Sequence, residues 1–538
     1  MSLAVQTRRR GRSSRPVAIL VALGLSAAGA CSKKQEPYAN TPTPTFDGAQ
    51  TGGTSAPTTT AAPGTNAVYA PQKPCKVEGL PKIDPTNPNR TQNYDCGTLS
   101  VPEDRAKPNG KKIKLQVVVL KSANPTPKPD PIVYLEGGPG GSALARVESW
   151  VREFKPLLAE RDVIMMDQRG TGYSEPTVSC TYEEQRAGST ETQVETLAKC
   201  HDRLAEDEFN FKAYNTRSNA ADFADLRAAL KLTEWNLFGV SYGTRLALQM
   251  MNDSPAGIRS AIIDSNFPAG VEFFKEIPAN AVRSFKAVFD ACAADATCAG
   301  ANPDLEGSLA TAIEKLDKYP LRDNNPFKAR EAKHRQFDGA AYASFLFTVL
   351  YDSKAIQLLP YLITAAAKGD PIDALIDYFP GGGGRDDGRP TFADGFYFTV
   401  TCAELGAPSD QIAMEAIVPP IDVRIRNAFV LDQLQSFEVC KRWNIPPSEV
   451  NLPTVDIPTL VFAGSFDPIT PPSWSQKAKA ALPKSRYVEI EGAGHGAYFT
   501  GPCAEGIAVS FLNDPANLGG EGGCPPVTKF TNRPLGTY

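Results

Sequence analysis

Residues 235–244 read W-N-L-F-G-V-S-Y-G-T. A short apolar run leads into G-x-S-x-G, and the apolar spacing of residues 244–251 predicts a helix directly after it. In such a strand–turn–helix setting the glycines let the strand and helix pass close together, while the serine is held at strained backbone angles. The strain exposes the Ser241 hydroxyl, and the helix N-terminus presents backbone N–H groups to an anion. The pattern predicts that Ser241 is a nucleophile; the alternative is a tight glycine turn that carries a surface serine.

A serine nucleophile needs a general base, and the chain has three histidines. His201 lies before the strand–turn–helix motif of Ser241, called the nucleophile elbow, in a polar helical stretch. His334 lies in the charged run E-A-K-H-R. His495 lies in G-A-G-H-G, a loop that follows the predicted strand 486–490. Only His495 follows the nucleophile after a core strand, which is the order Ser, acid, His. His495 is therefore the predicted base, and a surface histidine in a glycine loop is the alternative.

The acid that orients the base is expected in the loop after the preceding strand, 458–463. Asp467 occupies that loop, where its carboxylate would accept from one imidazole nitrogen and leave the other for Ser241. Asp264, at the end of the predicted strand 261–264, is the alternative acid. Asp456 precedes its strand, so it is expected at the opposite end of the sheet.

The oxyanion hole is predicted to combine the Tyr242 N–H with an N–H from an earlier loop. The sequence L-E-G-G-P-G-G-S at 135–142 follows the predicted strand 131–135. Glycine carries no side chain, so this backbone can approach a developing oxyanion closely. Gly138 is the preferred donor and Gly137 the second choice; a flexible loop without a binding role is the alternative.

Strand-like runs alternate with helical periodicity on both sides of the elbow, as at 112–121 and 218–230. This alternation predicts an α/β fold with a mostly parallel sheet and flanking helices. Residues 270–450 instead show amphipathic helical stretches and no strand-rich core, which predicts a mainly helical cap inserted before the last core strands. The expected organisation is a first core part at 75–269, the cap at 270–450, and a C-terminal core part at 451–538.

The N-terminus predicts export. Five arginines, the apolar stretch 17–25 and small residues at 26–30 are typical of a signal peptide covering residues 1–30. Cys31 follows the small residues as in a bacterial lipobox, which predicts lipidation; ordinary cleavage that leaves a free thiol is the alternative. Residues 31–74 are rich in Thr, Pro and Gly and predict a disordered tether. A net charge of −4, more acidic without the five arginines, argues against nucleic acid as a partner.

Eleven cysteines are also typical of an exported chain. With Cys31 set aside, ten remain and fall in near pairs. Five local disulfides are the simplest interpretation, although sequence alone leaves the connectivity open. No C-x-x-C motif or Cys/His cluster indicates zinc, and no metal or cofactor is implied. The near pairs are 75/96, 180/200, 292/298, 402/440 and 503/524.

The motifs together resemble a known family. G-G-P-G at 137–140, D-Q-R-G-T-G-Y-S at 167–174, the elbow, Asp467 and His495 resemble the proline iminopeptidase branch of the α/β-hydrolases. The likeness is closer to the secreted tripeptidyl aminopeptidases and spans roughly Cys75 to Cys524. It implies an α/β-hydrolase fold and a serine aminopeptidase. The first position of H-G-G-P-G is Glu136 here, which weakens the case for proline specificity.

The resemblance also implies roles for individual residues. Asp167 and Arg169 are expected to brace their loop by ion pairing. Glu404, in T-C-A-E at 401–404, matches the position of a carboxylate that holds the substrate's free α-ammonium. An exposed helix carboxylate is the alternative reading of Glu404.

The predicted function is an exported serine aminopeptidase of the cell envelope, lipid-anchored or else secreted or periplasmic. Its partners would be peptides with a free N-terminus, and its membrane contact only a lipid anchor. An esterase or lipase of the same fold is the first alternative, and a non-catalytic envelope lipoprotein is the second. Residue preference, the number of residues released and the oligomeric state stay open.

Overall fold

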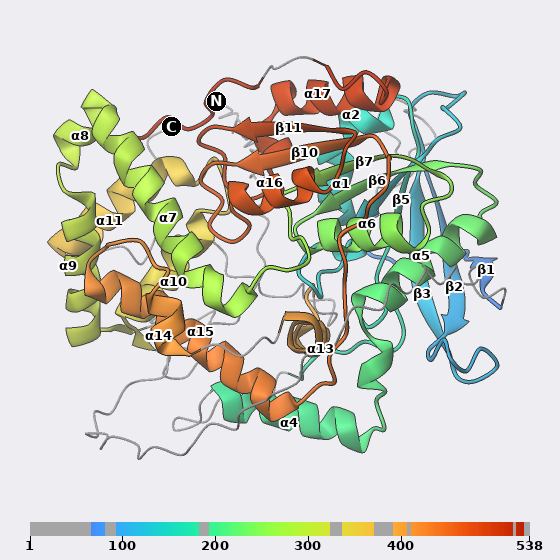
Figure 1. Cartoon of the computed structure of the whole chain (residues 1–538), viewed down its shortest axis with the longest axis horizontal. Coiled ribbons are helices and arrows are strands. Elements are labelled where there is room, and N and C mark those ends of the chain that lie inside the picture. The colour runs from blue at the N-terminus through green and yellow to red at the C-terminus, as the bar shows by residue number, and fades with distance from the viewer. Residues whose placement is uncertain are drawn as a thin grey trace, which may run out of the picture.

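A computed structural model describes residues 66–80, 93–181, 193–322, 336–370, 391–405, 410–519 and 523–531 (Figure 1). The predicted signal peptide, Cys31, His334 and the tether up to residue 65 lie outside the described residues. Among the described helices, none is both long and apolar enough to cross a membrane.

The core is a nine-stranded sheet within the described residues, in the order β1-β2-β3-β5-β4-β6-β7-β10-β11. From β5 to β11 neighbouring strands pair in parallel, and β1, β2, β3 and β5 pair antiparallel at one edge. The predicted α/β class with a mostly parallel sheet is confirmed. The strands are β1 Val68–Pro71, β2 Tyr94–Pro102, β3 Lys112–Leu120, β4 Ile132–Leu135, β5 Val163–Met166, β6 Trp235–Val240, β7 Ile258–Asp264, β10 Thr459–Gly464 and β11 Ser485–Ile490.

Helices cover both faces of this sheet (Figure 1). One face packs against an aromatic cluster in which Trp150 stacks on Phe154 with ring centroids 5.3 Å apart. The opposite face packs against apolar side chains of α5, α6 and α16. Helices α1 Val147–Glu153, α2 Lys155–Leu158 and α17 Pro502–Asn513, with the 3-10 turns η2 Leu144–Arg146 and η5 Ala497–Thr500, lie on the first face; α5 Thr216–Ala229, α6 Tyr242–Asp253 and α16 Pro472–Ala480 lie on the second.

The cap is mainly helical, as predicted, and gathers to one side of the sheet (Figure 1). It contains α7 Phe273–Ala294, α8 Ala296–Ala301, α9 Leu305–Lys318, α10 Gly339–Val349, α11 Leu359–Lys368, α13 Asp394–Leu405, α14 Gln411–Glu415 and α15 Val423–Trp443, with 3-10 turn η4 Ile356–Leu358 and the short pair β8 Leu321–Arg322 and β9 Gln336–Phe337.

At two places the boundaries of the core and the cap in the structure differ from those expected from the sequence. Strand β1 pairs with β2 and so joins the sheet before residue 75. Helix α4, Gln193–Glu206, precedes the elbow yet packs against the cap helix α15, and 3-10 turn η3, Phe211–Ala213, follows it. The reason is local: the apolar side of α4 is buried in the cap cluster, and Trp443 Nε1 donates to Leu197 O at 3.2 Å.

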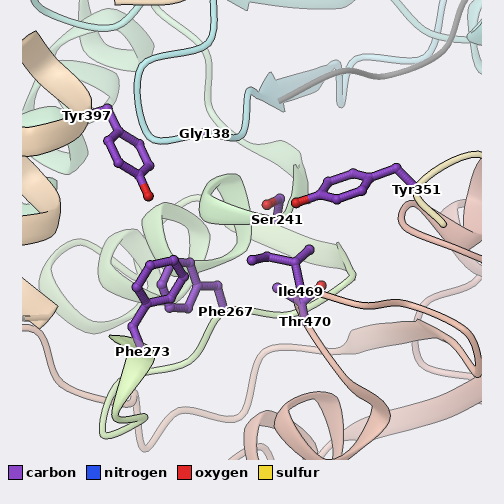
Figure 2. Close-up of a pocket in the computed structure, with 8 residues that line it drawn as sticks. All are labelled: Gly138, Ser241, Phe267, Phe273, Tyr351, Tyr397, Ile469 and Thr470. Carbon is purple, nitrogen blue, oxygen red and sulfur yellow. The ribbon is translucent and has the colours of Figure 1, made fainter. Parts of the chain in front are cut away.

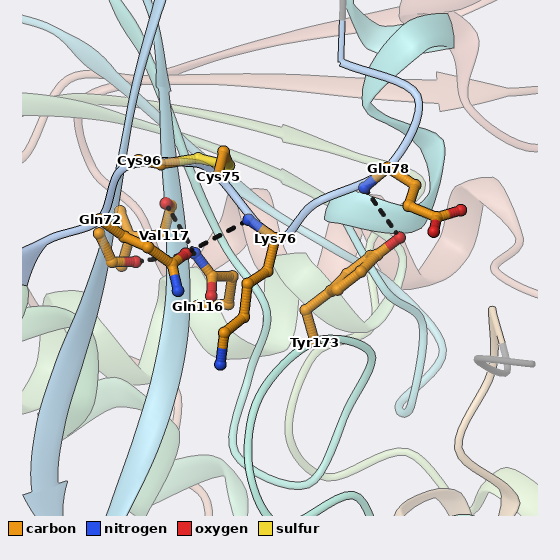
Figure 3. The surroundings of a disulfide bond; sticks show 9 residues. Gln72, Cys75, Lys76, Glu78, Cys96, Gln116, Val117 and Tyr173 are labelled. Carbon is orange, nitrogen blue, oxygen red and sulfur yellow. Dashed lines mark hydrogen bonds between the residues drawn. A yellow bond between two sulfur atoms is a disulfide. The ribbon is translucent and has the colours of Figure 1, made fainter. Parts of the chain in front are cut away.

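Five disulfides join the near pairs that the sequence suggested, with Cα–Cα distances of 5.0 to 5.7 Å. The Cys75–Cys96 bond fastens the incoming chain to β2 (Figure 3). Just beyond it, the Glu78 N–H donates to the Tyr173 hydroxyl at 3.1 Å, which ties the same segment to the D-Q-R-G-T-G-Y-S loop (Figure 3). Cross-links of this kind restrict the unfolded chain and stabilise the fold.

Candidate active site

Ser241 lies in the sharp turn between β6 and α6 with φ 58° and ψ −126°, a conformation that is strained for a residue with a side chain. The flanking glycines permit the turn. A Cβ at Gly239 would lie 2.4 Å from Gly243 O, and a Cβ at Gly243 would lie 2.0 Å from Leu135 O. The Ser241 N–H donates to Asp264 O at 3.0 Å, and the Thr244 hydroxyl donates to Ser241 O at 2.6 Å. These contacts hold the strained turn in place.

The loops after β10 and β11 bring Asp467 and His495 together. His495 Nδ1 lies 2.8 Å from Asp467 Oδ2, and both side chains are almost completely buried. Burial raises the pKa of Asp467, but attraction to His495 and hydrogen bonds from His495 and Thr470 outweigh it, so the pKa lies below its usual value. His495 Nε2 is buried and has no hydrogen-bond partner among the described residues. The imidazole is thus held at one nitrogen and open at the other.

Thr470, which the sequence interpretation missed, supports this pair. Its hydroxyl donates to Asp467 Oδ2 at 2.7 Å and lies 3.1 Å from His495 Nδ1. The Ile469 and Thr470 N–H groups donate to Asp467 Oδ1 at 3.0 and 2.9 Å. The signal in the sequence is a threonine three residues after an aspartate, a spacing typical of aspartates that accept from their own turn.

Asp264, the alternative acid, has a different task. Its buried carboxylate accepts from the Ala497 N–H at 3.0 Å and the Tyr498 N–H at 2.8 Å. Burial raises its pKa to about 6, although these hydrogen bonds act in the opposite direction. Asp264 therefore fixes the turn after His495, while Asp467 contacts the imidazole. Asp456 pairs with Lys484 at 3.3 Å, before β10 begins, at the opposite end of the strand.

The glycine loop after β4 distinguishes between the two oxyanion candidates. The Gly137 N–H donates to Glu136 Oε1 at 3.0 Å, so it is already engaged. Gly138, with φ 120°, lines the same pocket as Ser241. No acceptor among the described residues pairs with the Gly138 N–H or the Tyr242 N–H. The geometry favours Gly138 and Tyr242 as donors to an oxyanion.

The D-Q-R-G-T-G-Y-S loop is braced by its own buried charges. Asp167 accepts from the Ser142 hydroxyl and the Leu144 N–H at 3.0 Å and from the Tyr173 N–H at 2.8 Å, and burial raises its pKa to about 7. Arg169 pairs with Asp222 at 2.7 Å. Neither side chain lines the pocket beside Ser241, so both contacts are structural. The expected ion pairing is seen for Arg169 with Asp222, whereas Asp167 is held by hydrogen bonds from neutral donors.

A small pocket opens beside Ser241, between the core loops and the cap (Figure 2). Its empty space is about 330 Å³, including open solvent at its mouth. Figure 2 shows the Tyr351 ring pointing toward Ser241, with Tyr397 and the Phe267 and Phe273 rings around the space. None of the lining side chains is charged. The lining residues are Gly138, Ser241, Phe267, Phe273, Tyr351, Tyr397, Ile469 and Thr470.

A family model described as "alpha/beta hydrolase fold" matches residues 130–502. This range contains the elbow at Ser241, the loop that carries Asp467 (the acid loop) and the loop that carries His495 (the histidine loop). The chain belongs to the α/β-hydrolase fold family. The family match, the Ser241 elbow and the related peptidases together show that the protein is a serine hydrolase.

Two curated relatives of this α/β-hydrolase are peptidases by name. "Serine protease Hip1" of Mycobacterium tuberculosis H37Rv is 25% identical over 414 residues, 70% of this chain and 76% of the relative. "Tripeptidyl aminopeptidase" of Streptomyces coelicolor is 30% identical over 197 residues, 33% of this chain and 36% of the relative. A solved proline iminopeptidase from Mycobacterium smegmatis is 15% identical with a TM-score of 0.36, covering 78% of this chain and 98% of that one.

Glu404 of this α/β-hydrolase does not lie where the resemblance implied. Its side chain is fully buried, and its carboxylate accepts from Arg245 Nε at 2.8 Å. The Thr216 N–H and hydroxyl also donate to it, both at 2.8 Å. The carboxylate is thus fully buried among three protein donors, and Glu404 is not among the residues that line the pocket. The predicted binding role is wrong: Glu404 is a buried structural ion-pair partner, near the disulfide of Cys402.

The described residues contain no group of three or more His, Cys, Asp or Glu side chains that could hold a metal ion. The side chains and backbone of the site supply a strained serine, an imidazole oriented at one nitrogen, and the N–H groups of Gly138 and Tyr242.

Proposed function

We propose that this chain is an exported serine aminopeptidase, which hydrolyses peptide bonds near free N-termini through an acyl-enzyme. One observation carries the proposal: His495 is bound through Nδ1 to buried Asp467, and its Nε2 has no partner in the described part of the chain, close to a pocket that contains the strained Ser241. A serine nucleophile requires a base of this kind, an imidazole that an acid orients through one nitrogen while the other nitrogen stays available for the hydroxyl proton.

The reaction follows from that arrangement. Ser241 Oγ attacks the scissile carbonyl while His495 Nε2 accepts the hydroxyl proton. The oxyanion accepts hydrogen bonds from the Gly138 and Tyr242 N–H groups, which are fixed before reaction and need no rearrangement. His495 then donates the proton to the leaving amine, and water hydrolyses the acyl-enzyme by the reverse sequence. Asp467 keeps Nδ1 protonated and stabilises the imidazolium between these steps.

Two further observations support a peptidase that acts on chain ends. The curated relatives are named as a serine protease and a tripeptidyl aminopeptidase. Cap residues Phe273, Tyr351 and Tyr397 wall the pocket, so a substrate has little depth beyond Ser241. The apolar lining favours an apolar side chain next to the scissile bond.

The decisive experiment is a panel of chromogenic peptides of one to four residues, each with a free and with a blocked N-terminus. We expect cleavage of free peptides to exceed cleavage of the blocked ones at least tenfold in kcat/KM. The peptide length that is cleaved fastest gives the number of residues released. Equal rates on free and blocked peptides would refute the aminopeptidase assignment and leave a serine peptidase.

An esterase of the same fold is the second candidate, and the uncharged aromatic lining of the pocket favours it. Short acyl esters with matched apolar groups distinguish the two, with Ser241→Ala as the control. An esterase would cleave the esters and leave every peptide of the panel intact.

A non-catalytic lipoprotein is tested by labelling. A fluorophosphonate probe is expected to label the wild type and not Ser241→Ala, and an absence of Ser241-dependent labelling excludes any serine hydrolase mechanism.

Export and anchoring form the last part of the proposal. Five disulfides support folding in an oxidising compartment. Cys31, which lies outside the described residues, is proposed as the lipidated residue. Metabolic labelling with a fatty acid, compared between wild type and Cys31→Ala, tests it: label retained by Cys31→Ala would place the lipid elsewhere, and no label on either would leave a soluble exported chain.

A further inference from the structure

The acid loop is held from the cap as well as from the core. Helix α7 of the cap supplies Arg283 and Ser284, whose side chains reach three consecutive carbonyl groups of that loop. Arg283 Nη1 donates to Ser465 O at 2.8 Å, and Nη2 donates to Asp467 O. The Ser284 hydroxyl donates to Phe466 O at 2.5 Å. The backbone that carries the Asp467 carboxylate is therefore fixed by two neighbouring cap residues.

The cap also holds the histidine loop. The His495 N–H donates to Tyr351 O at 3.0 Å, and the Gly494 N–H donates to the Ser353 hydroxyl at 2.9 Å. Contact is so close that a Cβ at Gly494 would lie 2.3 Å from Leu350 O. Two separate cap segments thus contact the two loops whose side chains form the Asp467–His495 pair.

Arg283 differs from the other cap contacts because it is charged. It is partly buried, burial lowers its pKa, and its Nε has no partner among the described residues. No carboxylate among the described residues forms a direct ion pair with it. The negative charges of Asp467 and Glu489 act on Arg283 and oppose this lowering of its pKa. Its positive charge therefore acts on the triad acid through space, at the same time as its N–H groups hold that acid's backbone.

We propose that Arg283 is a positioning residue of the catalytic site, which fixes the Asp467 loop from the cap and whose positive charge opposes protonation of the His495 imidazole. The inference rests on the proposed serine hydrolase function. Among the described residues, the ionisable groups that face His495 are Asp467 at 2.8 Å, Asp264 through the following turn, and the Tyr351 ring at 4.9 Å. A fixed cation near Asp467 offsets part of the negative potential that would stabilise an imidazolium, and removing that cation is expected to change the pH dependence of the reaction.

The test is the pH profile of kcat/KM for Arg283→Met, Arg283→Lys and Ser284→Ala on a cleaved chromogenic substrate. Arg283→Met is expected to lower kcat about tenfold and to move the acid limb of the profile upward by about half a unit to one unit. Arg283→Lys keeps the charge, so its acid limb should stay near that of the wild type while kcat falls less. Ser284→Ala is the matched control: it removes a hydrogen bond to the same loop without a change of charge, and its acid limb should not move.

The inference fails if Arg283→Met has the acid limb of the wild type, or if Ser284→Ala moves the limb as far as Arg283→Met does. Each variant is first checked by circular dichroism and by fluorophosphonate labelling of Ser241. If Arg283→Met does not fold, it is replaced by Arg283→Gln, which is neutral and retains a hydrogen-bond donor. The acid limb of its pH profile is expected to move by the same amount. A labelled variant with an unmoved limb refutes only the role of Arg283, whereas a wild type without Ser241-dependent labelling refutes the proposed function itself.

Discussion

The carboxyl ends of the sheet's strands and the cap contribute different things to one site. The carboxyl ends of the core strands carry the proposed reacting groups on short loops: Ser241 after β6, Asp467 after β10 and His495 after β11. The cap carries no member of that set, yet it walls the pocket and contacts the backbone of both later loops. Reaction type therefore belongs to the core, whereas substrate choice and the exact placement of the loops depend on the cap. A cap that lifted away would disturb both loops, so it is better described as part of the site than as a lid.

The largest effect expected in the core separates its two buried aspartates. Asp467→Asn leaves an amide beside Nδ1, which favours the wrong imidazole tautomer, and should lower kcat about 10³- to 10⁴-fold. Asp264→Asn loosens the turn after His495 without touching the imidazole and should lower kcat about tenfold or less. Steady-state kinetics on one peptide substrate measure both. A larger loss for Asp264→Asn would reverse the roles and make Asp264 the orienting acid.

In the cap, shortening a pocket wall should change selectivity rather than chemistry. Phe273→Ala removes an aromatic wall and should raise KM about tenfold for peptides with an apolar residue next to the scissile bond, with kcat changed much less. Small residues at that position should be affected least. The comparison is made across peptides that differ only at that residue. A uniform fall in kcat for all of them would mean that the cap acts on the reaction itself and not on the fit of the substrate.

The sequence predicted the core strands and the position of the candidate residues on the loops after them, because the signals for both are local. The elbow glycines lie within two residues of Ser241, and the acid and base each follow their own strand directly. The disulfide partners lie 6 to 38 residues apart, so near pairs in the sequence are pairs in space. From the sequence we prefer Gly138 over Gly137 as an oxyanion donor, and the structure adds the physical reason that the Gly137 N–H is bound to Glu136.

Contacts between distant segments account for what the sequence did not predict. Glu404 pairs with Arg245, a residue 159 positions away, and no local sequence pattern predicts that partner. Arg283 reaches carbonyl groups more than 180 positions further on. Helix α4 reads as an ordinary amphipathic helix, and only tertiary packing assigns it to the cap. Such pairings depend on how the cap lies over the core, which periodicity and motifs do not encode.

The corrected role of Glu404 predicts a loss of stability with little change in selectivity. Glu404→Gln leaves the Arg245 guanidinium without its charged partner, and removing one member of a buried pair costs about 3 kcal/mol of unfolding free energy. Equilibrium unfolding in urea measures this loss. The ratio of cleavage rates on free and blocked peptides should stay within about twofold of the wild type, since the carboxylate does not line the pocket. A collapse of that ratio with unchanged stability would restore an ammonium-binding role.

The smallest effects concern how the same two aspartates change stability with pH. The pKa of Asp467 lies below its unfolded value, so its contribution is present above the unfolded pKa near 3.8 and is lost as pH falls further. The pKa of Asp264 is raised to about 6, so its contribution is fully present below pH 3.8 and is lost as pH rises through 6. The destabilisation by Asp264→Asn should therefore grow on acidification from pH 7 to pH 4. That of Asp467→Asn should hold constant over this range and shrink only below it.

Urea unfolding of both variants and the wild type, from pH 7 down to pH 3, measures these two trends, and each variant serves as the control for the other. The expected differences are on the order of 1 kcal/mol, near the limit of extrapolated free energies, so all three proteins are compared at one denaturant concentration within the transition. Parallel trends would mean that one shared environment controls both carboxyl groups. Opposite trends would show that neighbouring strands hold two aspartates in different states: one charged to orient His495, the other readily neutralised while it fixes the turn behind it.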